Sequence, residues 1–390
     1  MDNSATTRVD DRVIEEVVKY MRELYANPHS AHEFGFRAEE AMEHSRKIVA
    51  KALNARAEEI AFTSGGTESD NLALIGTFES QKEIGKKIIT DKIEHPAVLN
   101  AVRYLKSFHN AQIVELDVDS DGLVDPNQIL ENLDKETIIV SIMTANNEIG
   151  TIQPIREIGK LIRDRNEDSN SRTLFHTDAV QAFTKVDIDV NRENIDMLSI
   201  SAHKFHGPKG VGALYLRNQG QNVDGPFIFP TTYGGNQENG LRSGTSNVPG
   251  IVGLGKAVQL VLDHPEEKDR LKDLRDRLIN RLSSEISNFR LTGHPQKRLV
   301  NHVSFLVPDV SGERMLNMLS SNQIYVSTGS ACSAKSKSVS YVLKALKIPE
   351  PEIFGSMRWT MGRFNREDEI EYAVDIFKKI VDKLRSMGSN

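Results

Sequence analysis

The sequence predicts an α/β protein with a mostly parallel β-sheet covered by helices, followed by a smaller C-terminal α/β domain. Three observations predict it. Short apolar runs alternate with helical stretches from about residue 60 onward, which is the pattern of a parallel sheet whose strands are joined by helices. After about residue 250, two long charged helical stretches precede a mixture of short strands and helices. The 390 residues, of which 38% are hydrophobic, are enough for two such units.

Two helices are predicted first, over residues 10–24 and 36–53. Their apolar residues recur every three or four positions and therefore share one helix face. Asp10 or Asp11 can cap the first helix by accepting a hydrogen bond from a free backbone N–H. The two apolar faces consist of Val13, Val17, Met21 and Leu24 in the first helix, and of Ala41, Ile48, Val49 and Ala52 in the second.

The sheet is predicted from short apolar runs, and the helices from the stretches between them. Strands are expected at 60–63, 87–90, 137–143, 173–176, 197–200 and 211–216, and helices at 67–79, 96–107 and 154–165. The polar segment from Arg163 to Arg172 is interpreted as a surface loop.

The C-terminal part is predicted to contain helices at 248–263, 265–287, 338–346 and from about 366, with strands at 301–307 and 323–326. The domain boundary is expected near the second long helix. We therefore predict a large domain over residues 11–260 and a small domain over 261–390, with residues 1–10 packing near the small one.

Composition excludes several classes of protein. A net charge of -6 and a pI of about 6.0 argue against broad nucleic-acid binding, which needs a basic face. No run approaches 18 apolar residues, so no membrane span is expected, and the polar start predicts no leader peptide. The single cysteine, Cys332, cannot form an intrachain disulfide or a multi-thiolate metal site, which favours a reducing, cytoplasmic location.

The most informative stretch is Ser201-Ala202-His203-Lys204-Phe205-His206-Gly207-Pro208-Lys209-Gly210. It places Lys204 where a buried strand ends and a glycine-containing turn begins. Desolvation or a nearby cation lowers the pKa of a lysine and frees its lone pair for Schiff-base chemistry. Taken alone, the stretch is either a reactive lysine or a solvated surface turn.

A second turn, Thr63-Ser64-Gly65-Gly66-Thr67-Glu68-Ser69, follows a strand and opens a helix. Glycines let the backbone approach an anion, and the helix N-terminus can hold a phosphate, with Gly66 and Thr67 as the closest contacts. A glycine-bearing turn with a capping threonine is the alternative. The pattern differs from the nucleotide-triphosphate loop GxxxxGK[ST], so a nucleoside triphosphate is not implied.

Further polar residues follow other strands. Asp178 lies at the end of a strand, at the sheet edge where α/β proteins bind ligands, and could partner a pyridinium nitrogen or simply cap a helix. His95 could start a helix or titrate as a base. Asn147 could bond a ring hydroxyl or occupy a turn.

Anion contacts are also possible in the second half of the chain. Arg242 and Thr245 lie in a loop before the helix at 248 and could bind an anion. Arg358 lies on a short predicted strand, where arginine suits bidentate recognition of a carboxylate. An ordinary surface ion pair is its alternative.

Cys332 lies in Ser327-Thr328-Gly329-Ser330-Ala331-Cys332-Ser333-Ala334-Lys335-Ser336-Lys337-Ser338, a segment dominated by small residues. We expect a mobile loop. Buried structural cysteines usually have large apolar neighbours, and Lys335 and Lys337 would favour the thiolate. A reactive role is therefore favoured over packing.

Taken together, these residues resemble the cysteine desulfurases, in the class V aminotransferase branch of the fold-type-I pyridoxal-phosphate enzymes. The resemblance covers nearly the whole chain and rests on motifs in matching order. They are DNSATT (2–7), NPHS (27–30), SGGTESDN (64–71), NNEIG (146–150), DAVQ (178–181), SAHKFHGPKG (201–210), RSGT (242–245), GSAC (329–332) and MRWTMGRF (357–364). It implies a large domain with a mostly parallel seven-stranded sheet and a smaller C-terminal α/β domain.

The resemblance also implies a role for each matching residue. Lys204 resembles the lysine that forms the Schiff base with pyridoxal 5'-phosphate, and Cys332 resembles the nucleophile that becomes a persulfide. The implied phosphate ligands are Gly66, Thr67, Ser201 and His203, with Thr245 supplied by the neighbouring subunit of a homodimer. The remaining implied contacts are Asp178 to the pyridine nitrogen, Gln181 to the ring oxygen, His95 stacked on the ring and moving protons, and Asn147 and Arg358 on the substrate carboxylate.

The implied reaction removes sulfur from L-cysteine, gives L-alanine and leaves a persulfide on Cys332. The sulfur would pass to an iron–sulfur scaffold or another acceptor protein, for iron–sulfur cluster assembly or tRNA thiolation. No resident metal, membrane or direct nucleic-acid contact is expected, although Cys332 could transiently ligate an iron–sulfur cluster. The loop 163–172 appears longer than the family's, and the tail after the last helix is shorter, so the partner's docking mode stays open.

Three alternatives share parts of this pattern. A selenocysteine lyase needs the same residues. Another class V aminotransferase would not need Cys332 in an open serine-rich segment. A scaffold without catalysis would not need Lys204 or Cys332, and both are present.

Overall fold

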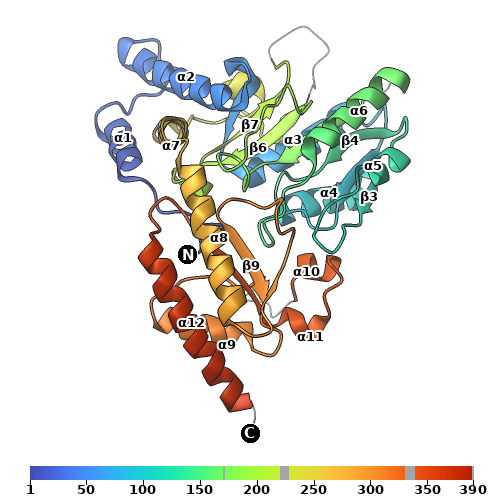
Figure 1. Ribbon diagram of the computed structural model, residues 1–390. Coiled ribbons are helices and arrows are strands. Elements are labelled where there is room, and N and C mark those ends of the chain that lie inside the picture. Colours follow the sequence, from blue (N-terminus) through green and yellow to red (C-terminus); the bar gives the residue numbers. More distant parts are fainter. Residues whose placement is uncertain (170–171, 220–227, 330–338, 389–390) are drawn as a thin grey trace.

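The computed structural model describes residues 1–169, 172–219, 228–329 and 339–388. A seven-stranded sheet with its covering helices forms the larger part, and a three-stranded sheet with long helices forms the part that contains the C-terminus (Figure 1). The fold class predicted from the sequence is confirmed.

The large sheet has the strand order β1-β7-β6-β5-β4-β2-β3. The pairs from β3 through β2, β4 and β5 to β6 are parallel, whereas β7 is antiparallel to both β6 and β1. Five neighbouring strands are buried along their whole length, because helices cover both faces of the sheet. They are β1, β7, β6, β5 and β4. The strands are β1 (Ile60–Thr63), β2 (Lys87–Asp91), β3 (Gln112–Leu116), β4 (Thr137–Ser141), β5 (Leu174–Asp178), β6 (Met197–Ser201) and β7 (Gly212–Leu216).

The helices around this sheet begin and end at residues suited to their positions. Asp10 caps α1 by accepting from the Arg12 backbone N–H, as predicted. Asn54 and Asn110 end α2 and α4 in the left-handed conformation that Asn tolerates. α1 and α2 pack on α7 beside the sheet (Figure 1). The helices are α1 (Asp11–Arg22), α2 (Glu33–Leu53), α3 (Gly66–Gln81), α4 (Pro96–His109), α5 (Pro126–Asn132), α6 (Ile155–Ser169) and α7 (Val248–Asp263).

The smaller sheet is antiparallel in the order β10-β9-β8. Its core contains Phe305, Trp359 and Phe377, whose rings meet edge to face with centroids 5.3–5.9 Å apart. α8 and α12 run alongside each other over this core (Figure 1). The elements are α8 (Glu267–Glu285), β8 (Arg290–Leu291), β9 (His302–Leu306), α9 (Gly312–Ser321), α10 (Tyr341–Ala345), α11 (Glu350–Ile353), β10 (Ser356–Thr360) and α12 (Glu367–Gly388).

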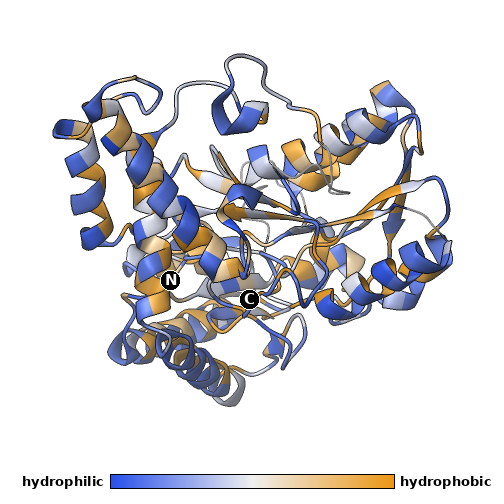
Figure 2. Ribbon diagram, turned by 90° about the horizontal axis from the view of Figure 1, so that it is seen from above, coloured by the Kyte–Doolittle hydropathy of each residue, from blue (hydrophilic) through white to orange (hydrophobic). Residues whose placement is uncertain are grey.

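Hydrophobic packing joins the two parts. Many helices carry a hydrophilic side and a hydrophobic side (Figure 2). The largest apolar cluster is built mainly on residues before 261 but also includes Leu306 and Leu343, while a second cluster centres on Trp359. The boundary at residues 260/261 therefore stays a prediction.

The first residues of the chain contact both parts. Asp2 forms a single parallel bridge with Thr360 of β10, and the Ser4 backbone N–H donates to the Thr360 hydroxyl. Thr7 and Asp10 donate their backbone N–H groups to the carbonyls of His203 and His206. The N-terminal segment thus links the small sheet to the turn that carries Lys204.

Two local predictions are wrong. Residues 323–326 form no strand: Ile324 and Val326 are buried and Tyr325 is exposed, as in a strand, but pairing is limited to one bridge between Ser327 and Arg358. The predicted loop from Arg163 is helical through Ser169. Its polar side chains form ion pairs at i,i+4 spacing, Lys160–Asp164 and Arg163–Glu167, which stabilise an exposed helix.

The short or polar elements β3, β8, α5, α9 and α11 were not predicted from the sequence. In the part of the chain that the structure describes, no helix combines the length and apolar character needed to cross a membrane.

Candidate active site

A cavity of about 340 Å³ opens where strands of the large sheet reach their carboxyl ends. In α/β proteins this edge collects the loops that bind ligands. Residues after β1, β2, β4, β5 and β6 line it, joined by the N-terminal segment and β10. The lining residues are Ser4, Ala5, Gly66, Thr67, Asp70, His95, Met143, Asn147, Asp178, Val180, Gln181, Ser201, His203, Lys204 and Arg358.

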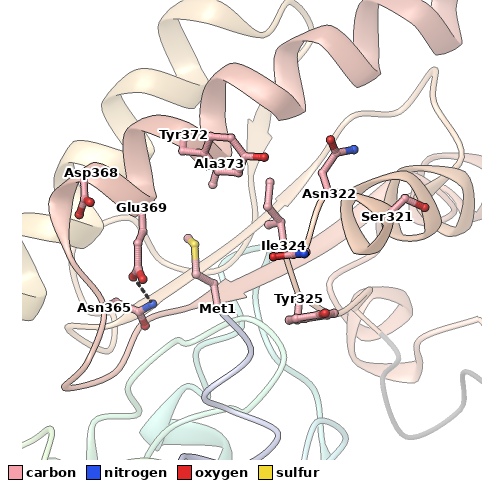
Figure 3. Close-up of a pocket in the computed structure, with 11 residues that line it drawn as sticks. Met1, Ser321, Asn322, Ile324, Tyr325, Asn365, Asp368, Glu369, Tyr372 and Ala373 are labelled. Atoms are coloured by element: carbon pink, nitrogen blue, oxygen red, sulfur yellow. Dashed lines mark hydrogen bonds between the residues drawn. The ribbon is translucent and has the colours of Figure 1, made fainter.

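A larger cavity, of about 650 Å³, lies between the start of α12, the segment after α9 and Met1 (Figure 3). Its lining includes Asp368 and Glu369, and the Asn365 amide donates to Glu369. Among its described lining residues there is no lysine, histidine or arginine. The smaller cavity therefore carries the chemically reactive groups, and the N-terminal segment reaches from one cavity to the other.

The turn between β1 and α3 approaches the smaller cavity closely. Gly65 has φ 151°, a conformation that L side chains rarely adopt. A Cβ added to Gly66 would lie 2.5 Å from Val180 Cγ2. This close packing brings the N-terminus of the 16-residue helix α3 to the cavity wall, beside Ser201 and His203. The arrangement suits a phosphate.

His203 faces the same end of the cavity. Burial, followed by repulsion from Lys204, lowers the pKa of His203 to about 4, so its ring is neutral at pH 7. Its Nδ1 lies 3.1 Å from the Thr6 hydroxyl. A neutral ring with one nitrogen engaged leaves the other nitrogen to contact a ligand.

Asp178 ends β5 and is 5% exposed. Burial raises the pKa of Asp178, while His95, the Val180 N–H and Lys204 oppose that shift. The Val180 backbone N–H donates to Asp178 Oδ1 at 2.8 Å. A cation placed against this carboxylate would restore its charged form, which matches the expected contact with a pyridinium nitrogen.

His95 caps α4, as one of the two sequence interpretations expected. Its Nδ1 accepts from the Ala97 backbone N–H at 3.2 Å, and Pro96 occupies the first helical position. Burial lowers the pKa of His95 below its usual value, with Asp178 opposing the shift. The cap fixes the ring at the cavity wall with Nε2 available to exchange a proton.

Lys204 reaches into the cavity from the short 3₁₀ turn after β6. Its Nζ donates to the backbone carbonyls of Ser4 at 2.5 Å and Ala5 at 3.0 Å. The Gln181 side-chain amide donates to the same Ser4 carbonyl at 2.9 Å. The N-terminal segment therefore orients both side chains toward a common point.

Arg358 is 3% exposed and closes the side of the cavity formed by β10. Its guanidinium donates to the Asn147 carbonyl and to Asp2 Oδ1, each at 3.1 Å. The Nε2 atom of His302, on β9, lies 3.2 Å from the same Asn147 carbonyl oxygen. Burial lowers the pKa of His302 well below its usual value, so the ring is neutral and donates this hydrogen bond through Nε2. The small sheet thus fixes both Asn147 and Arg358.

Four buried polar atoms of cavity-lining residues have no hydrogen-bond partner: Asp70 Oδ1, Asn147 Oδ1, Gln181 Oε1 and Arg358 Nε. Buried polar groups are normally satisfied. These atoms come from four separate segments that line one cavity, so polar ligands bound there would be able to satisfy them. The residues therefore fit a phosphorylated pyridine cofactor with a carboxylate substrate beside Arg358.

Asp70 was not identified from the sequence. It is 1% exposed and lines the cavity one helical turn beyond Gly66. Burial, followed by repulsion from Asp178, raises the pKa of Asp70 well above its usual value, which favours the neutral acid. Side-chain atoms of Asp70, His95 and Asp178 all lie within 4.8 Å of one another, a spacing that a metal ion could also use. In the sequence, Asp70 stands four residues after Gly66, on the same face of α3, and this spacing could have identified it as a cavity residue.

A polar layer lies beneath this group. His176 of β5 is fully buried and its ring nitrogens lie 2.9 Å from the Ser141 hydroxyl and 3.1 Å from the Ser199 hydroxyl. Burial lowers the pKa of His176 to about 3, so the ring is neutral. Its Nε2 lies 3.7 Å from Asp70 Oδ1. The layer connects β4, β5 and β6 directly below Asp178.

Two predicted residues, Thr245 and Arg242, do not line this cavity. Thr245 is exposed and lies outside it in the single chain. Arg242 donates to Glu68 Oε1 at 3.0 Å, so it anchors the start of α3. Cys332 falls within 330–338, outside the described residues. Asp2, Ser4, Ala5 and His302 were missed because their contacts join residues more than 150 positions apart in the sequence.

Comparison with known proteins shows one matching family and several similar proteins over nearly the whole chain. The aminotransferase class-V family model matches residues 1–373. The chain is 46% identical to a protein of Methanosarcina thermophila named cysteine desulfurase IscS, over 100% of this chain and 93% of the relative. A solved structure named NifS-like protein has a TM-score of 0.89 at 38% identity and covers 98% of this chain and 99% of its own. Another, SspA in complex with cysteine, has a TM-score of 0.79 at 33% identity, with 94% and 99% covered.

Proposed function

The chain belongs to the aminotransferase class-V family, and from this membership we propose that it is a pyridoxal-phosphate-dependent cysteine desulfurase. The proposal rests on one observation: Lys204, Asp178, His95 and Arg358 line the same cavity at the strand ends. The glycine turn between β1 and α3, which suits a phosphate, lines it as well. The full-length likeness to a protein named cysteine desulfurase and to a cysteine-bound structure supports the choice of L-cysteine as substrate.

The cofactor would be held by residues from both ends of the cavity. Gly66, Thr67, Ser201 and His203 would bind the phosphate, and Asp178 would face the ring nitrogen. Gln181 would face the ring oxygen, and Lys204 would supply the amine for covalent attachment. When bound, the cofactor would withdraw electrons from the substrate Cα, which acidifies the Cα–H bond and assists cleavage of the adjacent Cβ–S bond.

The chain's own groups would carry out the remaining tasks. Arg358 would bind the substrate carboxylate through its unpartnered Nε, with Asn147 beside it. Lys204 would move the proton at the substrate Cα, and His95, neutral at pH 7, would accept or return a proton through Nε2. All four residues line the same cavity.

We assign the sulfur-accepting role to Cys332. Its thiolate would attack the substrate sulfur, so that a sulfur–sulfur bond forms as the carbon–sulfur bond breaks. The carbon skeleton leaves as L-alanine after protonation, and the enzyme keeps the sulfur as a persulfide. The overall change is L-cysteine plus the Cys332 thiol to L-alanine plus the Cys332 persulfide, which balances without an external oxidant.

Oligomeric state and sulfur delivery form a further part of the proposal. We propose a homodimer in which Thr245 of one chain reaches the phosphate site of the other, since Thr245 is exposed and outside its own cavity. The sulfur would pass to an iron–sulfur scaffold or another acceptor protein. A cytoplasmic location suits a chain whose only cysteine must stay reduced between turnovers.

Intact-protein mass spectrometry after incubation with L-cysteine, without reductant and with a parallel alanine assay, tests the proposal. We expect a mass gain of one or more sulfur atoms that maps to Cys332, together with alanine. Cys332→Ser should keep the cofactor's spectral response to L-cysteine but gain no sulfur. Lys204→Ala should retain some cofactor but form no alanine.

The same experiment separates the alternatives. Alanine without sulfur on Cys332 would indicate a lyase that releases its chalcogen directly. Sulfide release by Cys332→Ser at the wild-type rate would refute the role of Cys332. If cofactor-loaded protein forms neither alanine nor a persulfide, the assignment of L-cysteine as substrate is refuted.

A further inference from the structure

Lys185 carries a buried ammonium group behind the Lys204 turn. Part of the residue is exposed, but burial of the nitrogen, followed by repulsion from Lys204, lowers the pKa of Lys185 to about 7. None of the ion pairs found among the described residues involves Lys185; Glu267, which lines the same small cavity, is bound by Arg363 at 2.8 Å. A buried ammonium without a carboxylate is unfavourable unless other groups satisfy it.

Two backbone carbonyls satisfy this ammonium. Lys185 Nζ donates to the carbonyl of Gln181 at 2.9 Å and to the carbonyl of Lys204 at 3.3 Å. Both acceptors belong to residues whose side chains line the active-site cavity. Because the pKa of Lys185 is about 7, both its ammonium and its amine form are present near pH 7, and both can donate. The contact therefore joins two segments that are separated by more than twenty residues.

The same two residues are also joined on the cavity side. The Ser4 carbonyl accepts from the Lys204 ammonium and from the Gln181 amide. Gln181 and Lys204 are therefore fixed from the front by Ser4 and from behind by Lys185. Removal of the rear contact would leave the Lys204 and Gln181 carbonyls without this shared donor.

The backbone before Lys185 is strained. Thr184 has φ 71°, in the left-handed region that a β-branched side chain rarely adopts. Such strain persists only where the surrounding structure stabilises it, and it concentrates at functional positions. Here it turns the chain between Phe183, which packs in the core, and Lys185, which reaches the Lys204 carbonyl.

We propose that Lys185 is a positioning residue that sets the direction of Lys204 and Gln181 in the active site through their backbone carbonyls. This inference rests on the proposed function. Lys185 touches neither substrate nor cofactor in this role. Lys204, His203, His206 and His302 interact electrostatically with Lys185. The shared cavity is also lined by Lys268 and by one carboxylate, Glu267, which is paired with Arg363.

The test compares Lys185→Met, which removes the charge and all donors, with Lys185→Arg, which keeps them. Lys268→Met is the matched control, because Lys268 lines the same cavity but pairs with Asp187.

For Lys185→Met we expect an unchanged Tm within a few degrees, and faster hydrogen exchange over residues 198–206 in the cofactor-free protein. In the loaded protein we expect a shifted pH midpoint of the cofactor absorbance and roughly tenfold lower kcat with KM within about twofold, corresponding to ~1.4 kcal/mol. Lys185→Arg should recover part of each change.

The outcomes decide the inference separately from the proposed function. The positioning role of Lys185 is overturned if Lys185→Met keeps the wild-type absorbance midpoint, hydrogen-exchange pattern and kcat. It is also overturned if Lys268→Met changes these quantities as much as Lys185→Met does. If Lys185→Met does not fold, Lys185→Gln, which is shorter and uncharged, takes its place with the same expected changes, and a wild-type midpoint and exchange pattern in Lys185→Gln overturns the inference. Failure of the wild-type protein to act on L-cysteine contradicts the proposed function, whereas the hydrogen-exchange result still reports whether Lys185 holds the Lys204 turn.

Discussion

At the scale of single residues, burial decides the charge of the groups around the cavity. Burial raises the pKa values of Asp70 and Asp178 and lowers those of His95, His176 and His203. Neutral histidines can accept protons or donate hydrogen bonds at pH 7, and a protonated Asp70 avoids repulsion with Asp178. Asp178 remains the carboxylate that a bound cation would stabilise.

His176 provides a measurable consequence of this burial. Its folded pKa is about 3, against about 6.5 for an unfolded histidine. Between those values the unfolded chain binds a proton that the folded chain does not. The contribution of His176 to the unfolding free energy should therefore fall by about 1.4 kcal/mol per pH unit as pH decreases from 6.5 toward 3.

The non-titrating variant His176→Gln should lose less unfolding free energy than the wild type over this range, as measured by urea denaturation at pH 7.0 and 4.5. The exposed His29→Gln is the control and should follow the wild type. A wild-type pH dependence in His176→Gln would show that His176 is protonated in the folded protein.

At the scale of elements, the site depends on how helices and strands begin and end. His95 caps α4, Gly65 turns the chain into α3, and β5 ends at Asp178. α10 shows the same principle after residues 330–338. Its cap, Ser340, is 2% exposed; the hydroxyl accepts from the Leu343 N–H and donates to Glu148 Oε2 at 2.6 Å. Glu148 follows Asn147, so α10 is anchored to the loop that faces the substrate site.

Ser340→Ala should cost more stability than the loss of a helix cap alone. It removes the cap and leaves the buried Glu148 carboxyl without its hydroxyl donor, although burial has already raised the pKa of Glu148 to about 7. We expect a loss of about 2 kcal/mol in urea denaturation. Ser311→Ala, at the exposed cap of α9, should cost about 1 kcal/mol. Equal costs would mean that the Glu148 contact contributes nothing.

At the scale of the whole molecule, the site is assembled from distant parts of the chain. The large sheet supplies most of the cavity lining, β10 supplies Arg358, and the N-terminal segment lies between them. Arg358 and Asp2 are paired at 3.1 Å although they stand at opposite ends of the sequence. Displacement of the small sheet would therefore disturb substrate binding before it disturbed the cofactor contacts.

The proposed dimer makes a prediction at this scale. Lys204→Ala inactivates the chain's own site, and Thr245→Asp would place a negative charge against the phosphate of the neighbouring site. Each variant alone should be inactive or weakly active. After unfolding and joint refolding, mixed dimers should regain activity, because one of their two sites combines an intact Lys204 with an intact Thr245. An activity equal to the average of the two single variants would show that Thr245 acts within its own chain.

The sequence by itself determined the fold class and most of the chemistry. Apolar runs that alternate with helical stretches predicted the parallel sheet, because strands buried on both faces need continuous apolar residues. Local turns at Gly66, Asp178 and Lys204 predicted candidate site residues at strand ends, and the structure brings these three residues to one cavity.

Only the tertiary structure decided how these residues meet. Asp2 with Arg358, Ser4 with Lys204, and Lys185 with the Lys204 carbonyl are contacts between distant segments, and no local periodicity encodes them. Polarity alone also misled at residues 163–169, where ion pairs extend α6 beyond the apolar face formed by Ile155, Ile158 and Ile162. The physical reason is common to these cases: local sequence sets backbone preference, whereas burial and pairing depend on which distant segment packs against it.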